Sequence, residues 1–368
     1  MVLASVAIAA SGLLLAGCGS SNDNGSTGTS SSAAAAAKPK VGVILPDTKS
    51  SARWETNDAP LLKAAFDAAG VDSDIQNAQG DKTQFQTIAD GMITEGVDVL
   101  MIVNLDSGSG SAVLAKAKAQ GIATIDYDRL TLGGGADFYV SFDNTKVGQL
   151  QGEGLQKCLT DAGKTTANIA FLNGSPTDNN ATLFKAGAVA ALQAKTTSGD
   201  YKVVADQAVP DWDNQQAGTI FEQMYTQTGG KIDGVLAAND GLGNAAIAIL
   251  KKNGVNGTIP VTGQDATDQG LQNILAGDQC MTVYKAIKKE ADAASALAIA
   301  AAKGADTSSL ATGSVTDTQT SKKVAAVLLD PEAIYFANVK DVIADGFTTK
   351  DKVCTAALAD ACTKAGIS

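Results

Sequence analysis

The stretch VDVLMIVNLDSGSGSAVLAKAKAQGIATIDYDR at residues 97–129 contains a complete strand–helix–strand unit and decides the fold class. Residues 97–103 form an apolar run of strand length, residues 111–120 have a helical pattern, and residues 122–125 form a second short apolar run. Such runs predict strands that are buried on both faces. Because strands joined through a helix lie parallel in one sheet, the unit predicts an α/β fold with helices on both faces of the sheet.

The same alternation continues on both sides of this unit. Further strands are expected at residues 41–45, 71–75, 168–172, 201–205, 234–237 and 259–262. Further helices are expected at residues 61–69, 84–95, 147–159, 181–194, 215–226 and 243–252. A chain of 368 residues exceeds what one hydrophobic core usually serves. We therefore expect two doubly wound parallel sheets, each forming one Rossmann-like lobe.

The residues that follow the apolar runs share one chemical character. They carry planar or multiply donating hydrogen-bonding groups and include both tryptophans of the chain: Arg53, Trp54, Asp128, Arg129, Asn144, Asp178, Asn180, Trp212, Asn239, Asp240, Asp265 and Lys285. In open parallel sheets, ligands bind beyond the carboxyl ends of the strands. A sugar hydroxyl both donates and accepts hydrogen bonds, and a flat indole can cover the apolar face of a pyranose ring. The set therefore predicts a monosaccharide-binding site.

Each residue of this set also has a simpler interpretation. Asp and Asn are common at helix starts, where the side chain caps free main-chain N–H groups. Trp212 alone is equally compatible with a core position, and Arg53 alone with a solvated charge. The gathering of the whole set at strand ends, where charged partners make the stronger hydrogen bonds, favours a binding site.

The overall composition excludes several classes of function. The net charge of −11 argues against nucleic acid or an anionic bilayer as the main partner. The chain contains no histidine, which removes imidazole metal ligands and histidine-dependent nucleophilic triads. We expect no metal site, no cofactor and no enzymatic activity.

The amino terminus has the pattern of an export signal. Residues 2–17 are apolar and small, too short a run for a transmembrane helix, and they end in Leu15-Ala16-Gly17-Cys18. This ending resembles the bacterial lipobox, which predicts a signal peptide at residues 1–18 and lipidation of Cys18, although no Lys or Arg precedes the apolar run. Residues 19–38 are rich in Ser, Gly and Ala and predict a flexible tether to a lipid anchor.

Four cysteines lie beyond this segment: Cys158, Cys280, Cys354 and Cys362. Four cysteines in an exported protein suggest two disulfides, with three possible connectivities. Because no CxxC spacing is present, we do not expect a zinc site. Four free or buried thiols remain the alternative.

Several short strings resemble one known family. They are KSSARW at 49–54, YDRL at 127–130, SFDN at 141–144 followed by KVG at 146–148, GSP at 174–176 followed by DNNA at 178–181, GQDA at 263–266 and MTVYK at 281–285. In this order they resemble the monosaccharide-binding proteins of ABC importers, in the group that contains the xylose-binding and multiple-sugar-binding proteins. The strings spread over residues 40–347, which is nearly the whole expected body.

The resemblance implies a type I periplasmic binding protein fold, with two lobes joined by a three-segment hinge near Phe142, Gln264 and Tyr284. The N-terminal lobe would comprise residues 39–142 plus 265–284, and the C-terminal lobe residues 143–264 plus 285–368. The family's ligand contacts would then fall on the set of residues given above. Arginines and Lys285 would donate to hydroxyls, and carboxylates and amides would accept or bridge. Trp212 would stack on the sugar, and Trp54 would be either the second aromatic contact or a wall residue.

The expected function is capture of an aldose monosaccharide outside the cytoplasm by a monomeric lipoprotein, which delivers it to an ABC permease and its ATPase subunit. The resemblance places xylose first, with glucose, galactose and arabinose close behind. Lobe closure on the sugar would generate the form that docks. The protein would meet the membrane only through its lipid anchor.

Four alternatives differ in class. A sensory protein would pass the liganded state to a receptor. A glycosidase would use a pair of carboxylates, for which Asp128 and Asp265 are the candidates. The string GLGNAA at 241–246 imitates a nucleotide-binding loop but lacks the final glycine of the stricter pattern. A repressor would need a helix-turn-helix head, and the signal-like segment occupies that place.

Overall fold

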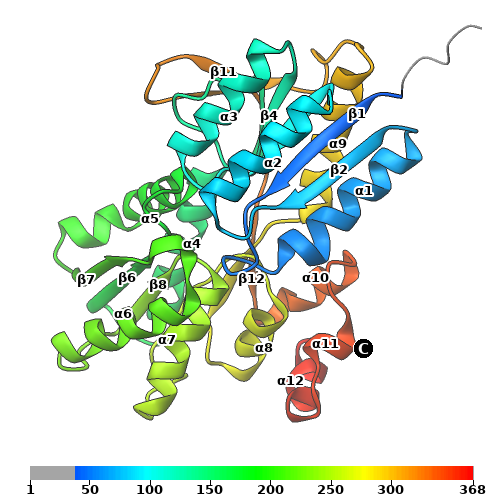
Figure 1. Cartoon of the computed structure of the whole chain (residues 1–368). Helices are drawn as coiled ribbons and strands as arrows, with labels where there is room; N and C mark the ends of the chain where they lie inside the picture. Colours follow the sequence, from blue (N-terminus) through cyan, green and yellow to red (C-terminus); the bar gives the residue numbers. More distant parts are fainter. Residues whose placement is uncertain (1–37, 368) are drawn as a thin grey trace, which may run out of the picture. The chain divides into compact units, whose positions relative to one another are not determined.

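The computed structural model describes residues 38–367 (Figure 1). The expected signal peptide, Cys18 and the expected tether up to residue 37 lie outside the described residues. No helix between residues 38 and 367 is both long and apolar enough to cross a membrane.

The first lobe is built on a seven-stranded sheet in the order β10-β11-β5-β4-β3-β1-β2. Its strands are β1 (Lys40–Leu45), β2 (Asp72–Asn77), β3 (Val99–Ile102), β4 (Ala123–Tyr127), β5 (Phe138–Phe142), β10 (Gly313–Thr316) and β11 (Lys323–Leu329). All neighbouring strands are parallel except β10 and β11, which are antiparallel. The carboxyl ends of β1, β3, β4 and β5 therefore lie along one edge.

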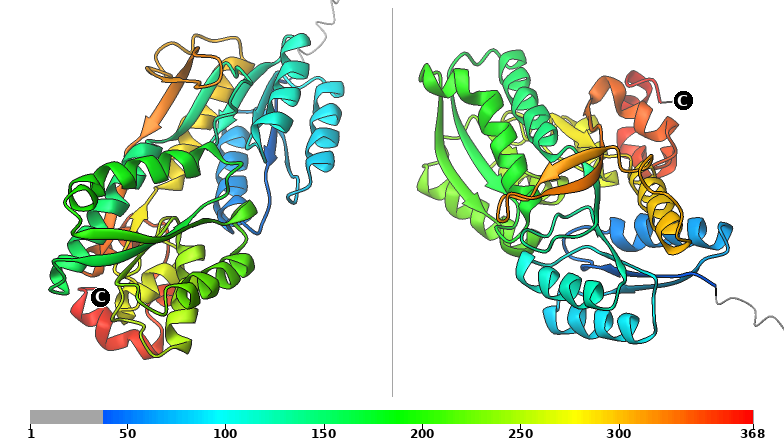
Figure 2. Two further views of the ribbon diagram at one scale, coloured as in Figure 1. Left: turned by 90° about the vertical axis from the view of Figure 1, so that its left-hand side faces the viewer. Right: turned by 90° about the horizontal axis from the view of Figure 1, so that it is seen from above.

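Helices cover both faces of this sheet (Figures 1 and 2). They are α1 (Ala59–Ala68), α2 (Lys82–Thr94), α3 (Ser107–Ala119) and α9 (Ile287–Ala302). Val43 of β1 packs in one core with Phe66 of α1 and Leu297 of α9. The next residue of β1, Ile44, packs in a second core with Phe85 of α2. Successive side chains of a strand alternate between faces, so an apolar run such as 41–45 fills both cores.

The second lobe contains a three-stranded parallel sheet in the order β7-β6-β8, extended by an isolated parallel bridge between Val235 and Val261. An antiparallel pair, β9 and β12, adjoins it. The strands are β6 (Ala167–Asn173), β7 (Tyr201–Ala208), β8 (Gly234–Ala237), β9 (Met281–Tyr284) and β12 (Glu332–Tyr335). The helices are α4 (Asn144–Asp161), α5 (Asn179–Thr197), α6 (Asn214–Gln227), α7 (Asp240–Lys252), α8 (Asp268–Ala276), α10 (Val339–Ala344), α11 (Lys350–Val353) and α12 (Ala359–Lys364).

Here too the sheet is covered on both faces. Leu155 of α4 and Leu192 of α5 pack with Phe171 of β6. The neighbouring Leu172 packs on the other side with Phe221 of α6 and residues of α7. The prediction of an α/β fold with two lobes of mostly parallel sheet is confirmed.

Three segments of the chain connect the lobes: residues 142–144 between β5 and α4, residues 284–287 between β9 and α9, and residues 329–332 between β11 and β12. The parallel pairing of β11 with β5 places residues 323–329 in the first lobe. The pairing of β9 with β12 places residues 281–284 in the second. Figure 1 shows α9, in yellow, beside α1, although the two helices lie more than half the chain apart in sequence.

This division differs from the expected boundaries, which place residues 265–284 in the N-terminal lobe and residues 285–368 entirely in the C-terminal lobe. The chain does not leave the second lobe at Gln264. The main-chain N–H of Asp265 donates to the oxygen of Val283 at 2.8 Å, and the N–H of Val283 donates to the oxygen of Gly263 at 3.1 Å. The segment after Gln264 therefore folds back onto the second lobe, and the crossing follows Tyr284.

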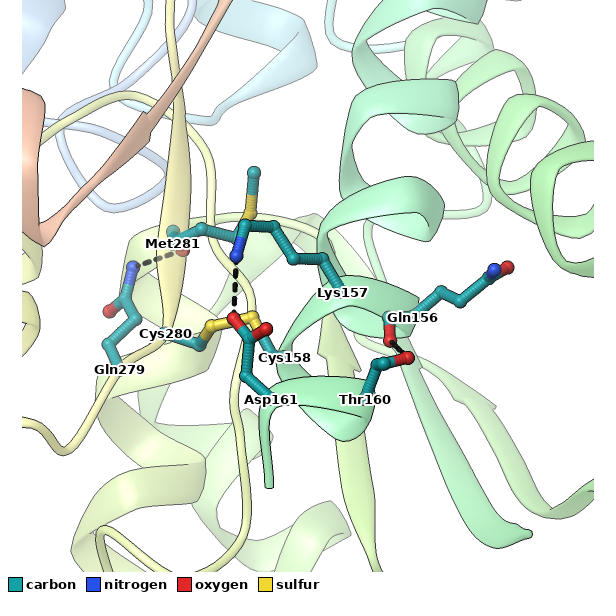
Figure 3. The surroundings of a disulfide bond; sticks show 8 residues. All are labelled: Gln156, Lys157, Cys158, Thr160, Asp161, Gln279, Cys280 and Met281. Atoms are coloured by element: carbon teal, nitrogen blue, oxygen red, sulfur yellow. Dashed lines mark hydrogen bonds and ion pairs between the residues drawn. A yellow bond between two sulfur atoms is a disulfide. The ribbon is translucent and has the colours of Figure 1, made fainter. Parts of the chain in front are cut away.

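Both disulfides within residues 38–367 lie in the second lobe. Cys158 bonds to Cys280 across 122 residues, and Cys354 bonds to Cys362 across 8 residues. Figure 3 shows the first of these between α4 and the start of β9. Since α4 follows the first crossing and β9 precedes the second, this disulfide joins the two ends of the long segment that forms most of the second lobe.

Helices α4 and α5 approach closely because glycines face each other where they cross. A side-chain carbon at Gly148 of α4 would overlap the main-chain oxygen of Phe184, and one at Gly187 of α5 would overlap that of Thr145. Both positions require the absence of a side chain rather than an unusual backbone conformation.

Replacing Gly187 by alanine is expected to lower the free energy of unfolding by about 3 kcal/mol, the upper end of the usual cost of overpacking, because backbone atoms rather than flexible side chains must move. Chemical denaturation measures this loss. Gly218→Ala is the matched control, since a carbon there meets no atom within 4 Å and lies inside helix α6. The control should be neutral or slightly stabilising, and equal effects of the two variants would contradict the crossing argument.

Candidate functional site

A pocket lies between the two lobes, at the carboxyl ends of the strands. Residues from both lobes line it: Ser50, Ser51, Arg53, Trp54, Asp128, Arg129, Asp178, Asn180, Phe184, Trp212, Asn239, Gln264, Asp265 and Lys285. The structure thus gathers all but two of the residues expected from the sequence. The exceptions, Asn144 and Asp240, lie outside the lining.

Arg53 is the most heavily bonded cation of the pocket. It precedes the π-helical turn Trp54–Asp58, whose last residue it contacts. Its Nε donates to Asp58 Oδ2 at 2.9 Å and its Nη2 to Asp58 Oδ1 at 2.7 Å. Nη2 also donates to Glu290 Oε2 at 2.6 Å, and Nη1 donates to Asp128 Oδ2 at 3.0 Å. Although burial alone would lower it, the three carboxylates hold the pKa of the guanidinium well above its ordinary value.

Asp128 connects the lobes. It follows β4 with a positive φ of 62°, a backbone conformation that turns its carboxylate away from the strand direction. Asn180 of the second lobe donates through Nδ2 to the main-chain oxygen of Asp128 at 2.9 Å and to its Oδ1 at 3.2 Å. Burial opposes ionisation, but Arg53, with Lys285 and Arg129, lowers the pKa of Asp128. The pocket therefore presents this group as a carboxylate.

A second contact between the lobes joins Arg129 to Asp178. Arg129 Nε lies 3.2 Å from Asp178 Oδ2, and the Trp212 Nε1–H donates to the same oxygen at 3.0 Å. The geometry of the arginine contact is that of an ion pair without an aligned hydrogen bond, so the Nε–H remains without a hydrogen-bonded acceptor. That donor is available to a ligand in the pocket.

Trp212 is fixed in orientation by its surroundings. Its ring lies so close to Gly174 that a side-chain carbon at that glycine would overlap it. Phe184 meets it edge to face, with ring centroids 6.3 Å apart. The loop that carries it is strained, with φ of 54° at Asp211 and 56° at Trp212. This arrangement holds a flat apolar surface against the pocket.

Trp54 has a different environment. Its ring lies beneath the guanidinium of Arg53, 4.3 Å from ring centroid to Cζ, and its Nε1–H donates to Ser50 Oγ at 3.2 Å. Ser50 is in turn held by Asp47. Since Trp54 is only 2% exposed, it supports Arg53 and contributes an edge to the wall.

The far side of the pocket is formed by Asp265 and Lys285, whose carboxylate and ammonium lie 3.2 Å apart. Burial alone would lower the pKa of Lys285, but Asp265 and Asp128 raise it, so the ammonium stays charged. Beside them the Gln264 Oε1 is buried and has no hydrogen-bond partner within residues 38–367. An unpaired buried acceptor is costly, and because Gln264 lines the pocket, this oxygen is a candidate for a ligand contact.

Comparison with known proteins identifies the family to which the chain belongs. Residues 41–306 match the family described as periplasmic binding protein domain. The chain belongs to the periplasmic binding protein family. This result agrees with the two-lobed fold and with a pocket between the lobes.

Curated relatives of this periplasmic binding protein include two D-xylose-binding periplasmic proteins. That of Haemophilus influenzae is 36% identical over 85% of this chain and 92% of its own length. That of Escherichia coli is 36% identical over 84% of this chain and 90% of its own length. A multiple sugar-binding periplasmic protein of Azospirillum brasilense is 34% identical over 85% and 90%, respectively.

Among solved structures, an ABC transporter solute binding protein from Clostridium phytofermentans with bound β-D-glucose is similar. It has a TM-score of 0.76 and 28% sequence identity, and the match covers 85% of this chain and 99% of that one. The similarity therefore extends over both lobes of the periplasmic binding protein.

The two predicted residues outside the lining support it from behind. Asn144, the first residue of α4, donates through Nδ2 to Asn180 Oδ1 at 2.9 Å. Asp240 is fully buried and accepts hydrogen bonds from Gln279 Nε2 and from Thr282 Oγ1, each at 2.8 Å. Burial, followed by the nearby Asp265, raises the pKa of Asp240 to about 7. Both oxygens of Asp240 accept hydrogen bonds from neighbouring residues, and the Asn144 amide nitrogen holds Asn180, so both residues position their neighbours.

Four lining residues of this periplasmic binding protein are absent from the sequence prediction: Ser50, Ser51, Phe184 and Gln264. The sequence contained a pattern that could have identified two of these residues. Gln264 directly precedes Asp265 at a strand end. Phe184 follows Asn180 by four positions on α5 and therefore shares its helix face. The serines gave no chemical signal beyond their place after β1.

Proposed function

We propose that this periplasmic binding protein binds an aldose monosaccharide in the interlobe pocket and delivers it to an ABC importer. The observation that carries the proposal is the convergence of charged donors, charged acceptors and a fixed indole, from both lobes, on one pocket. A neutral ring bearing several hydroxyls matches such a lining better than an ion does, because cations and anions are both present.

In the proposed complex, Arg53, Arg129 and Lys285 donate to hydroxyls or to the ring oxygen. Acceptors are Asp128, Asp265 and Gln264, while Asn180 and Asn239 bridge. Trp212 covers the apolar face of the ring. Because each buried polar group needs a partner, a ligand that lacks one of the matching hydroxyls loses more affinity than a single hydrogen bond contributes.

D-Xylose is the first choice of ligand. The names of the two D-xylose-binding relatives support it. The glucose-bound structure supports D-glucose as a second candidate, and the multiple sugar-binding relative supports a site that accepts more than one sugar. Galactose and arabinose are the remaining candidates of our proposal. One hydroxymethyl group distinguishes a hexopyranose from a pentopyranose, so the choice depends on the wall at a single ring position.

In our proposal, a closed form of the protein delivers the sugar to the permease. Arg129 with Asp178 and Asp128 with Asn180 join the lobes around the pocket. A sugar bound to both lobes adds to these contacts and shifts the equilibrium towards closure. A sensory role at a receptor would use the same closed form. Loss of sugar uptake in a strain that lacks the protein supports transport, and loss of chemotaxis alone supports sensing.

The alternative of a glycosidase is disfavoured by the state of Asp128. Glycoside hydrolysis needs one carboxylic acid that can give up a proton to the leaving oxygen. Burial opposes ionisation of Asp128, but Arg53, Lys285 and Arg129 lower its pKa, so it carries no proton to donate. Periplasmic binding proteins bind their ligands without converting them, and we assign no enzymatic activity.

We further propose that Cys18 is lipidated after removal of residues 1–17 and anchors the protein to the outer face of the membrane. The support is the Leu15-Ala16-Gly17-Cys18 string and the Ser/Ala-rich segment that follows it. Mass spectrometry of the amino-terminal peptide from membrane-extracted protein tests the modification.

Sugar binding is tested first by thermal unfolding with a panel of xylose, glucose, galactose and arabinose. A ligand at one hundred times its Kd stabilises the folded protein by about 2.7 kcal/mol, which raises Tm by on the order of 5 °C. Glycerol serves as a control that offers hydroxyls without a ring. No shift with any sugar would contradict the proposed function, whereas a shift with a hexose alone would replace xylose as the ligand.

A further inference from the structure

Glu290 lies behind the pocket rather than in its lining. It belongs to α9 of the first lobe and is fully buried. Its Oε2 accepts the hydrogen bond from Arg53 Nη2 at 2.6 Å, while its Oε1 has no hydrogen-bond partner within residues 38–367. The proposed sugar contacts leave this carboxyl without an assigned role.

The hydrogen bonds around Arg53 determine what that residue can offer a sugar. A guanidinium has five N–H donors. Two of them go to Asp58, one goes to Glu290 and one goes to Asp128. A single N–H of Nη1 is left for a ligand. Asp58 and Glu290 therefore hold the guanidinium from the side away from Asp128 and fix the direction of its free donor.

The cluster holds more carboxyl groups than cations. Around Arg53 lie the carboxyls of Asp58, Asp128 and Glu290. The other cation that acts on Glu290, Lys285, is paired with Asp265. The hydroxyl of Tyr127 in β4 donates a hydrogen bond to Asp58 Oδ1 at 2.5 Å. The buried Tyr139 of β5 is close enough for the charges of Asp128 and Glu290 to act on its hydroxyl. An ionised Glu290 would leave one charged oxygen buried without a donor, which is more costly than a neutral carboxyl there.

The titration behaviour of the neighbours agrees with this geometry. Burial raises the pKa of Glu290 to about 8. The Arg53 guanidinium opposes this shift, and the carboxylates of Asp128 and Asp58 reinforce it. Burial also raises the pKa of Tyr127 and of Tyr139 well above 10, and Lys285 stays charged, so these groups keep one form between pH 7 and pH 9.

We propose that Glu290 is a positioning residue of the sugar pocket, and that the sugar binds preferentially to the form of the site in which Glu290 carries a proton. This inference rests on the proposed sugar-binding function. A bound sugar displaces the remaining water from the pocket and so removes solvation from any charge behind it. The ionised form of Glu290 loses more solvation free energy than the neutral form does. The sugar-bound state therefore favours the protonated form of Glu290.

The direction of the pH dependence follows. Below the pKa of Glu290 the proton is already present, and the affinity is at its plateau. As the pH rises through about 8, binding must first return the proton, and the affinity falls. Full linkage weakens binding of the sugar about tenfold between pH 7 and pH 9.

The experiment is calorimetric titration of the full chain with D-xylose, or with the aldose that gives the largest thermal shift, at pH 6, 7, 8 and 9. The affinity of the wild-type protein for the sugar should fall about tenfold from pH 7 to pH 9. At pH 8, heats in buffers of different ionisation enthalpy should show uptake of a fraction of one proton on binding. Glu290→Gln cannot ionise and should show equal affinity at pH 7 and pH 9, with no proton uptake.

Two further variants separate positioning from structure. Glu290→Ala removes the hold on Arg53 and should weaken binding at every pH, and Glu290→Gln should restore part of that loss. Asp126→Asn is the matched control. Asp126 is another buried carboxyl of the first lobe, and burial raises its pKa to about 7. It accepts hydrogen bonds from Thr131 rather than from Arg53. In this control variant, the affinity for the sugar should still fall between pH 8 and pH 9, as it does in the wild type.

The outcomes distinguish this inference from the proposed function. If no aldose binds at any pH, the sugar-binding function itself fails. If the wild type binds with a flat profile from pH 7 to pH 9, or if Glu290→Gln keeps the wild-type profile, the role of Glu290 is overturned while sugar binding stands. A folded Glu290→Gln protein that binds no sugar at pH 7 would equally overturn it, because the charge would then be required.

Discussion

Replacing Asp128 by alanine is expected to weaken the affinity for the sugar by about 30- to 4,000-fold, because truncating one member of a buried charged pair costs about 2–5 kcal/mol. The variant loses the carboxylate that accepts from the ligand. It also frees the Nη1 donor of Arg53 and removes the Oδ1 that Asn180 contacts from the second lobe. Isothermal titration calorimetry with the best sugar of the panel measures the change.

The effect should be specific to the site. Asp90→Ala is the matched control, since Asp90 is an exposed carboxylate of the same lobe that pairs with Lys116 on the surface. Exposed pairs contribute little, and this variant should bind within about twofold of the wild type. A loss of less than tenfold in a folded Asp128→Ala protein would remove Asp128 from the set of ligand contacts.

Removing the Cys158–Cys280 disulfide by replacing both cysteines with serine is expected to lower the free energy of unfolding of the second lobe by about 5 kcal/mol. A crosslink stabilises mainly by restricting the unfolded chain, and the restriction grows with the length of the closed loop. The loop here spans 122 residues, and that of Cys354–Cys362 spans 8. The same relation gives about 2.5 kcal/mol for the shorter disulfide.

The measurement can be made lobe by lobe. The chain has two tryptophans, of which Trp54 belongs to the first lobe and Trp212 to the core of the second. In a Trp54→Phe background, fluorescence during denaturation follows the second lobe. The Cys354→Ser/Cys362→Ser variant is the control. If the shorter crosslink proves the more stabilising, loop length is not the dominant factor.

Much of the fold was predictable because each apolar run is short and local. The run at 122–125 became β4 at residues 123–127, and the pattern at 215–226 became α6 at residues 214–227. What the sequence could not supply was the partner of each strand. The apolar residues of Met281–Tyr284 indicate a strand but do not distinguish pairing with β12 from pairing in the first sheet. The expected boundaries came from the family resemblance. They differ from the structure at Gln264, where the chain stays in the second lobe, and at residues 329–332, where the third crossing lies.

In the candidate site, too, local patterns were predictable from the sequence and long-range contacts were not. Strand ends bring together residues that a parallel sheet places along one edge, so Arg53, Asp128 and Asp265 could be found from position alone. Glu290 could not, because it lies in an alanine-rich helix and meets Arg53 across 237 residues of sequence. Asp58 was missed for a related reason. It ends a π-helical turn, and no simple repeat predicts that its carboxylate turns back to Arg53.

The three crossings have a consequence for how the protein is made. A nascent chain that ends at residue 284 lacks β11, so the β5 edge, with Val140 and Phe142, has no neighbour on that side. It also lacks β12, the partner of β9. Neither lobe can complete its sheets until almost the whole polypeptide has emerged. A stalled chain would expose an unpaired, apolar strand edge, and such edges promote aggregation. Circular permutation that makes one half contiguous would remove that dependence.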